Sequence, residues 1–167
     1  LARIELAKHH FKEAIGYLNK MIADPVEGIE ALGLRFDNHF ALGQLQEAQQ
    51  DLKRIEERKK RGLFRYSRGL IERASKDYIQ KFEAIFLTRQ AIWLAATGQI
   101  QRADKNFKTA IQLLGTLQEE SRIWLYTVYA YFLMKNHRFE EAQIHLTWAL
   151  NQNVHYLPAL VAWLEMA

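Results

Sequence analysis

The sequence of 167 residues contains no cysteine. This absence excludes disulfide bonds, zinc sites built from thiolates, and a thiol nucleophile. Only two prolines and eight glycines occur, so few positions would interrupt a long helix. No apolar run approaches the roughly 20 residues that a membrane-spanning helix requires. The remaining composition is dominated by good helix formers, and we therefore expect an all-α chain.

Groups that would support catalysis are also scarce. The three serines are Ser67, Ser75 and Ser121, and none stands in the context of a nucleophile elbow. Ser75 and Ser121 instead precede segments with helical patterns, where serine is a favoured first residue. No glycine-rich phosphate loop is present. Since no converging set of reactive groups can be identified, we predict that the chain is not an enzyme and uses no cofactor.

The histidines do not indicate a metal site. His137, Glu141 and His145 are four residues apart from one to the next, which places them along one side of a helix. The outer two would lie about 12 Å apart along that helix, too far for all three to bind one ion. The adjacent His9 and His10 point to different faces. We predict no metal ligands in this chain.

The composition that remains is sufficient for a folded core, with 49% hydrophobic and 25% charged residues. The net charge of +4 is distributed unevenly. Residues 58–76 contain eight Lys or Arg and a single Glu, which gives this segment a charge of +7 and leaves −3 for the rest. Any attraction to a polyanion is therefore expected to be local to residues 58–76.

An internal repeat is visible at residues 9–25, 42–58, 97–113 and 136–152. In each segment a large apolar residue is followed three positions later by Ala, then by an apolar residue four positions on, and by another three positions further. Spacings of three, four and three keep these side chains on one stripe of an α-helix. The four sets are Phe11, Ala14, Leu18 and Met21; Leu45, Ala48, Leu52 and Ile55; Ile100, Ala103, Phe107 and Ala110; and Phe139, Ala142, Leu146 and Ala149.

A second amphipathic stretch precedes three of these segments, at residues 27–42, 81–97 and 121–136. The predicted unit is therefore a helix, a tight turn and a second helix. The recurring Ala would let the two helices approach closely. Gly43 and Gly98 stand where the first helix would end in a residue with positive φ.

This pattern resembles the tetratricopeptide (TPR) family of 34-residue helix–turn–helix repeats. Ala14 and Ala48 are 34 residues apart, the period of the family, whereas the next two intervals are 55 and 39 residues. The resemblance implies a right-handed α-solenoid of about four degenerate TPR-like repeats, with an insertion in the middle. It implies units one and two at 1–57, the insertion at 58–76, and units three and four plus the first helix of a further unit at 77–167.

The sequence begins and ends within patterns that look helical. We expect such terminal half-units to expose apolar surface, so that either flanking repeats or self-association would cover it. At the C-terminal end this expected face consists of Leu157, Leu160, Val161 and Trp163.

The insertion gives a basic amphipathic pattern when residues 61–78 are placed on a helical wheel. Its basic side and the preceding arginine form a predicted acidic-partner stripe of Arg58, Arg61, Arg65 and Arg68. Three interpretations remain open. The arginines are a solvated face, or they dock an acidic protein or a nucleic-acid backbone, or the helix lies on a membrane surface.

The resemblance further implies that the first helices of successive units line a concave groove for a peptide or helix of a partner protein. Trp124 and Tyr131 are the side chains most typical of interface anchors. We therefore predict a protein–protein interaction scaffold, with docking of a polyanion or acidic partner through the arginine stripe as the alternative. The groove residues predicted in this way are Trp124, Thr127, Tyr131, Met134 and Lys135 from unit four, and Ile85, Thr88 and Ile92 from unit three.

Overall fold

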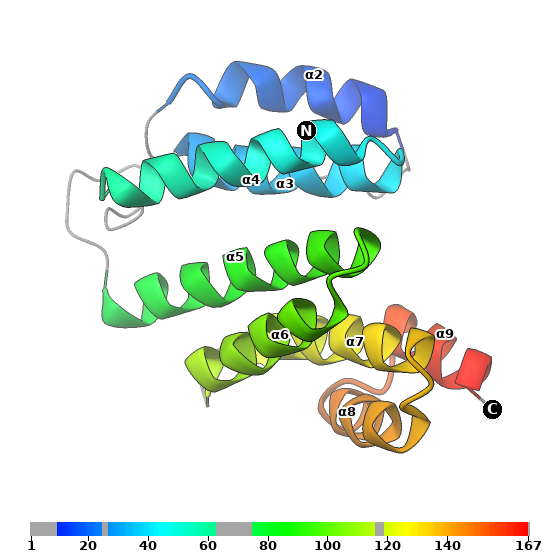
Figure 1. The fold of residues 1–167 in the computed structure, drawn as a ribbon. Helices are drawn as coiled ribbons and strands as arrows, with labels where there is room; N and C mark the ends of the chain where they lie inside the picture. Colours follow the sequence, from blue (N-terminus) through cyan, green and yellow to red (C-terminus); the bar gives the residue numbers. More distant parts are fainter. Residues whose placement is uncertain (1–9, 25–26, 63–74, 116–118, 167) are drawn as a thin grey trace. The chain divides into compact units, whose positions relative to one another are not determined.

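The computed structural model describes residues 10–24, 27–62, 75–115 and 119–166. Over these residues the protein is all-α, with eight helices that pack mainly against their sequence neighbours, as helical hairpins do (Figure 1). The helices are α2 (Phe11–Met21), α3 (Glu27–Ala41), α4 (Leu45–Lys60), α5 (Lys76–Ala96), α6 (Ile100–Leu114), α7 (Glu119–Lys135), α8 (Phe139–Gln152) and α9 (Leu157–Met166). The chain forms two compact units, Leu1–Phe82 and Glu83–Ala167, whose boundary falls within α5.

In the first unit, α3 packs against both α2 and α4 (Figure 1). Its buried face includes Leu32 and Phe36, which are at most 1% exposed. Arg35 forms a bidentate ion pair with the buried carboxylate of Asp51 on α4, and its Nη1 donates a hydrogen bond of 2.6 Å to Asn19 Oδ1 on α2. One arginine of the middle helix thus links it to both neighbours.

The helices α5, α6, α7, α8 and α9 all contribute to the core of the second unit. Aromatic rings are prominent in it. The ring of Phe107 on α6 lies 5.1 Å from the ring of Tyr129 and 5.2 Å from that of Phe132, both on α7. α7 also packs against α8 and α9 (Figure 1), so this helix is the centre of the unit.

The predicted alanine stripe is confirmed. Ala14, Ala48, Ala103 and Ala142 have no exposed surface, and the residues four positions after them are also buried. The large apolar residue that opens each stripe is less buried than the next two residues of the stripe. Ile100 and Phe139 are 37% and 47% exposed, and Phe11 and Leu45 are only partly buried. All four are the first residue of their helix, where the hairpin has only just turned and less of the partner helix is available to cover them.

The turns within three hairpins share one backbone conformation. Gly43, Gly98 and His137 have φ values of 73°, 81° and 58°, which confirms the positive φ expected for the two glycines. In each turn this residue donates to the carbonyl three positions earlier, and the following residue donates to the carbonyl five positions before itself. This is the Schellman arrangement, which satisfies carbonyls at the end of the first helix. Since each turn residue lies five positions before the buried Ala, the three hairpins have a common register.

The common register brings together pairs of side chains that are 16 residues apart. In the first of these pairs Arg35 meets Asp51, and in the second Asn106 Nδ2 donates a hydrogen bond of 2.8 Å to Gln90 Oε1. In the third, the rings of Tyr129 and His145 lie 4.9 Å apart. The α3–α4, α5–α6 and α7–α8 hairpins therefore have different types of side-chain interaction at one equivalent position.

The structure describes only the two ends of residues 61–78, the segment that was placed on the helical wheel. The helix α4 ends at Lys60, its C-cap is Arg61, and Gly62 follows with a φ of 75°, so Arg58 belongs to α4. Ser75 Oγ accepts a hydrogen bond of 3.2 Å from the backbone N–H of Tyr78, which confirms Ser75 as a helix-start residue and places Tyr78 in α5. The centre of the expected basic helix, including Arg65 and Arg68, lies outside the described residues.

Candidate interaction surfaces

The first candidate surface involves the first helices of the second unit. Arg89 on α5 lies over the ring of Trp124 on α7, with its guanidinium carbon 6.0 Å from the ring centroid. On the same helix Tyr131 donates a hydrogen bond of 3.3 Å from its hydroxyl to the carbonyl of Pro158 on α9. Burial, reinforced by the nearby charge of Glu165, raises the pKa of this hydroxyl. The two predicted anchor residues thus contact α5 on one side and α9 on the other.

The other predicted groove residues differ in exposure. Lys135 is exposed, and Ile85, Ile92 and Met134 are partly exposed, as are Trp124 and Tyr131. Thr88 and Thr127 are buried, with 0% and 2% exposure, so the structure places them inside the protein and not on an open groove. Their hydroxyls donate to the carbonyls of Ala84 and Ile123, at 2.7 and 2.8 Å. This local bond satisfies a threonine hydroxyl within its own helix and makes burial possible.

The second candidate surface lies on α4 and centres on Arg58. Its guanidinium donates hydrogen bonds of 2.6 Å to the carbonyl of Ile22 and 3.0 Å to that of Asp24, just beyond the end of α2. A side chain at Gly28 would meet Arg58 and would place its Cβ 2.7 Å from the Ile22 carbonyl oxygen, so glycine is required for this close approach. The predicted stripe residue Arg58 thus has a role inside the fold.

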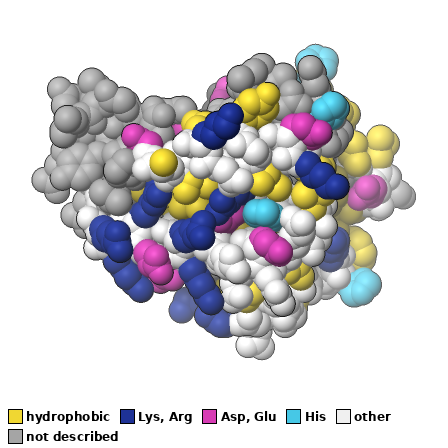
Figure 2. All heavy atoms as spheres, turned by 90° about the horizontal axis from the view of Figure 1, so that it is seen from above, with side chains coloured by type: hydrophobic (Ala, Val, Ile, Leu, Met, Phe, Trp, Pro, Cys, Tyr) yellow, Lys and Arg dark blue, Asp and Glu magenta, His cyan; other side chains and the backbone are white. Residues whose placement is uncertain are grey.

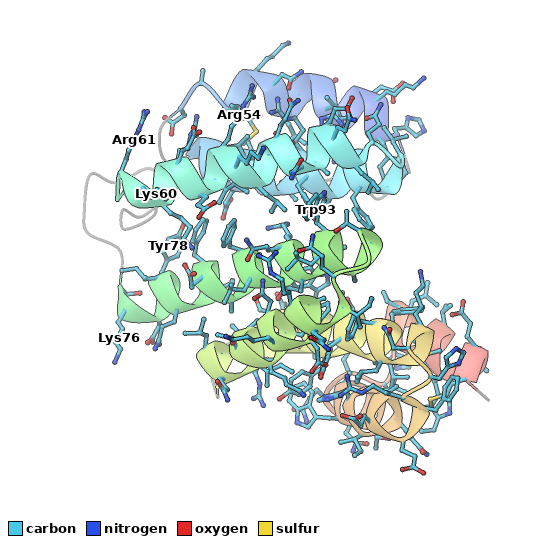
Figure 3. The ribbon with its side chains drawn as sticks, viewed as in Figure 1. Arg54, Lys60, Arg61, Lys76, Tyr78 and Trp93 are labelled. Carbon is cyan, nitrogen blue, oxygen red and sulfur yellow. The ribbon has the colours of Figure 1, made fainter. Side chains whose placement is uncertain are left out.

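Arg58 is flanked by Arg54 and Arg61, which are exposed. Burial lowers the pKa of Arg58; the charge of Asp24 acts in the opposite direction, while those of Arg54 and Arg61 lower it further. Spacings of four and three residues put the three arginines on one side of α4. Figure 3 shows Arg54 and Arg61 projecting from the same side of this helix. We call Arg54, Arg58 and Arg61 the α4 arginine cluster.

Arg54 was missed because the sequence interpretation began the basic segment at residue 58. The regular spacing of 54, 58 and 61 is the signal that would have included it. Figure 2, which views the molecule from above, shows Lys and Arg side chains gathered on part of the visible face. Lys60 lies on the same helix, 3.9 Å from Glu56. Of the four predicted stripe residues, the structure brings Arg58 and Arg61 together with Arg54, and the other two are outside the described residues.

A group of polar side chains in the second unit has a structural role. Asp104 on α6 accepts hydrogen bonds from the Tyr129 hydroxyl at 2.8 Å and from Arg138 Nη1 at 2.7 Å, and it pairs with Lys108 at 2.7 Å. Burial alone would raise the pKa of Asp104, but these three donors lower it overall. Burial and the hydrogen bond to Asp104 raise the pKa of Tyr129. The group joins α6 to the α7–α8 turn, and every strong donor in it already has an acceptor.

The spaced His137, Glu141 and His145 are not arranged around a common point. Glu141 binds Arg138 through two hydrogen bonds of 2.6 Å, and this contact lowers the pKa of the carboxylate. His145 is packed against the rings of Tyr126 and Tyr129, 5.2 and 4.9 Å away. Within the described residues, no group of three or more His, Cys, Asp or Glu side chains could hold a metal ion.

None of the described helices is both long enough and apolar enough to cross a membrane. Comparison with protein-family models and with curated proteins gave no match for this chain. The fold is therefore known as an all-α arrangement of paired helices, and its function is inferred from the two surfaces described above.

Proposed function

We propose that the chain is a protein–protein interaction module that binds a peptide or helix on the α5–α7 face of its second unit. The hairpins would stack as a degenerate TPR-like solenoid, with first helices on the binding side. The observation that carries this proposal is the pairing of Arg89 with Trp124 across two successive first helices. Arg and Trp are the residue types most enriched at energetically important positions of interfaces.

The surroundings of Trp124 also support binding on this face. Tyr131 lies seven residues further along α7 and is partly exposed, and exposed Lys135 follows it by four residues. These spacings extend one side of the helix over about three turns. A partner segment could therefore contact two aromatic side chains and one cation along α7.

The proposal can be tested with a photo-crosslinking residue at position 135. Lys135 is exposed, so replacement by benzoylphenylalanine should leave the fold intact. As a matched control, the same residue replaces Thr147, which is exposed on α8. We expect a discrete protein adduct from position 135 and not from position 147. Equal labelling at both positions, or none at 135 under conditions where 147 reacts, would contradict the proposal.

A second candidate function rests on the α4 arginine cluster. Because the Ile22 and Asp24 carbonyls hold the guanidinium of Arg58, it is fixed between two exposed arginines. A fixed guanidinium loses less entropy on binding than a freely moving one. We propose that this cluster could dock an acidic protein segment or a nucleic-acid backbone.

The test of the cluster compares two double variants of equal charge. Arg54→Gln/Arg61→Gln removes the exposed members, and Lys12→Gln/Lys20→Gln removes two exposed cations from α2. Binding to a fluorescent duplex DNA is measured at several salt concentrations. Because each lost phosphate contact reduces the slope of log K against log salt by about 0.9, the first variant should reduce it by about 2. Equal slopes for the two variants would show that the attraction is non-local and remove this candidate.

A further inference from the structure

A pocket lies between the beginning of α8 and the end of α9, and none of the residues proposed above to bind a partner lines it. Phe139, Glu140 and Gln143 line it from α8, and Trp163 and Met166 line it from α9. Its volume is about 340 Å³, at the lower end of the range of roughly 300–1,000 Å³ typical of ligand pockets. This volume suits one long side chain of a partner better than a large ligand.

The two helices that form this pocket, α8 and α9, carry acidic side chains and no Lys or Arg. No Lys or Arg follows Arg138 in the sequence, whereas Glu140, Glu141 and Glu165 do. Glu141 is already bound to Arg138 through both of its oxygens. In the part of the chain that the structure describes, no hydrogen bond or ion pair engages Glu140, which is exposed beside the pocket. A carboxylate is therefore available to a cation that enters.

The other residues that line the pocket are also suited to binding a cation. Phe139 is 47% exposed, so much of its ring is open to contact. Trp163 is partly exposed while it packs on the core of the second unit. Aromatic faces attract cations, and a planar guanidinium also stacks on them. Met166 adds an adaptable apolar wall for the aliphatic stem of the side chain.

We propose that the α8–α9 pocket binds an arginine side chain of a basic peptide on a partner protein, with the guanidinium between the aromatic walls and the Glu140 carboxylate. This inference does not depend on the α5–α7 face, because it concerns other residues and a partner of defined charge. A negative result for one proposed site would not contradict the other.

The experiment uses an acetylated and amidated peptide with four arginines separated by glycines. The control peptide contains citrulline in place of arginine, which keeps the planar shape and removes the charge. Binding to the 167-residue chain is followed by calorimetry, and shifts in the amide and indole NMR signals locate it. We expect the arginine peptide to shift the signals of residues 139–143 and the indole of Trp163, and the citrulline peptide to bind at least about tenfold more weakly.

Two single variants define the site. Glu140→Gln and Phe139→Ala should each weaken binding of the arginine peptide about fivefold or more. Glu120→Gln is the matched control, because Glu120 is exposed in the first turn of α7, at the opposite end of the α7–α8 hairpin. It should leave the affinity unchanged. Retained circular dichroism spectra establish that each variant is folded.

Three results would overturn the inference. The first is equal binding of the arginine and citrulline peptides, which would identify an apolar site. The second is equal loss of affinity in Glu140→Gln and Glu120→Gln, which would indicate diffuse charge attraction. The third is self-association by light scattering that Glu140→Gln abolishes, without peptide binding, which would show that a second copy of the chain occupies the pocket.

Discussion

The α3–α4 and α7–α8 hairpins turn in the same way and are held together by different interactions. In the first, Arg35 and Asp51 form an ion pair at the equivalent position, and the turn residue is Gly43. In the second, the rings of Tyr129 and His145 pack against each other at a tilt at that position, and the turn residue is His137. The buried alanines and the turn geometry fix the hairpin, whereas the pair that is 16 residues apart is free to vary.

The two hairpins also differ in how their polar groups are used. The α3–α4 ion pair has a carboxylate with 1% exposure, which is bound by Arg35 and lies 3.9 Å from His39 Nε2. The polar group of the second unit is spread over Asp104, Lys108, Tyr129, Arg138 and Glu141. Loss of one contact should matter more where a buried charge has a single strong partner.

The largest expected effect comes from breaking the buried ion pair. Asp51→Asn leaves the Arg35 guanidinium without its charged partner and should lower the free energy of unfolding by about 2–4 kcal/mol. Asn106→Ala removes the amide contact at the equivalent position of α5–α6 and should cost about 1 kcal/mol. Urea unfolding followed by circular dichroism measures both. Equal costs would show that the position, and not its chemistry, sets the stability.

The control for this comparison is Glu47→Gln, because Glu47 is an exposed acidic residue on the same helix as Asp51. It should change the free energy of unfolding by less than about 0.5 kcal/mol. A loss as large as that of Asp51→Asn would mean that the net charge of α4, and not the contact with Arg35, is responsible.

The next largest effect on stability comes from the turn residues. It has opposite signs in the α7–α8 and α5–α6 hairpins. His137 adopts a φ of 58°, which costs a residue with a side chain about 1 kcal/mol. His137→Gly should therefore stabilise the second unit by up to about 1 kcal/mol. Gly98→Ala, with a φ of 81° in the wild type, should destabilise by about the same amount. Thermal melts of the two variants measure this difference.

Loss of the contact between the His137 and Phe139 rings, whose centroids are 6.0 Å apart, opposes the gain in His137→Gly. His137→Asn separates the two contributions, since Asn tolerates positive φ better than most residues and also lacks the ring. We expect its stability to lie between those of the wild type and the glycine variant. A glycine variant less stable than the asparagine variant would contradict the explanation from backbone strain.

The smallest expected effect is a dependence of stability on pH, which arises from His145 in the aromatic pair. Burial lowers the pKa of His145, against the opposing charge of Glu141. Above the ordinary value of about 6.5 the ring is neutral in both the folded and unfolded states, and stability does not depend on it. Below that value the unfolded ring binds a proton that the folded ring does not. Stability should therefore fall as the pH falls from about 6.5 towards the folded pKa.

The check is a comparison of urea midpoints at pH 7.5 and pH 5.5 for the wild type and His145→Gln. The wild type should lose more stability between these pH values, because glutamine cannot titrate. The lowered pKa values of Asp104 and Glu141 make their contributions fall away at lower pH, outside this window. An equal loss in both proteins would show that His145 is not the titrating group.

Much of the hairpin architecture could be predicted from the sequence. The alanines are buried because only a small side chain allows two helix backbones to approach, and their spacing is visible in the printed residues. Gly43 and Gly98 indicate their turns because glycine readily adopts positive φ. His137 carries no such signal, and only its position five residues before Ala142 reveals it.

The candidate surfaces were less predictable. A helical wheel cannot show that Thr88 and Thr127 bond to their own helix and are buried, because exposure depends on the neighbouring helices. The role of Arg58 depends on the carbonyls of Ile22 and Asp24, 36 and 34 residues earlier. A helical wheel over residues 61–78 treats them as one helix, whereas α4 ends at Lys60, before Gly62, and Ser75 accepts a hydrogen bond at the start of α5.

The central claim is that the α5–α7 face of the second unit binds a partner, and the chain offers a matched pair of tryptophans to test it. Trp124 is covered by Arg89 between α5 and α7, and Trp148 is covered by Arg122 between α7 and α8. The most direct measurement is the affinity of Trp124→Ala and Trp148→Ala for the partner that crosslinks at position 135. We predict at least about a tenfold loss for Trp124→Ala and less than about a twofold loss for Trp148→Ala. Equal losses, or unchanged affinity of a folded Trp124→Ala, would contradict the account.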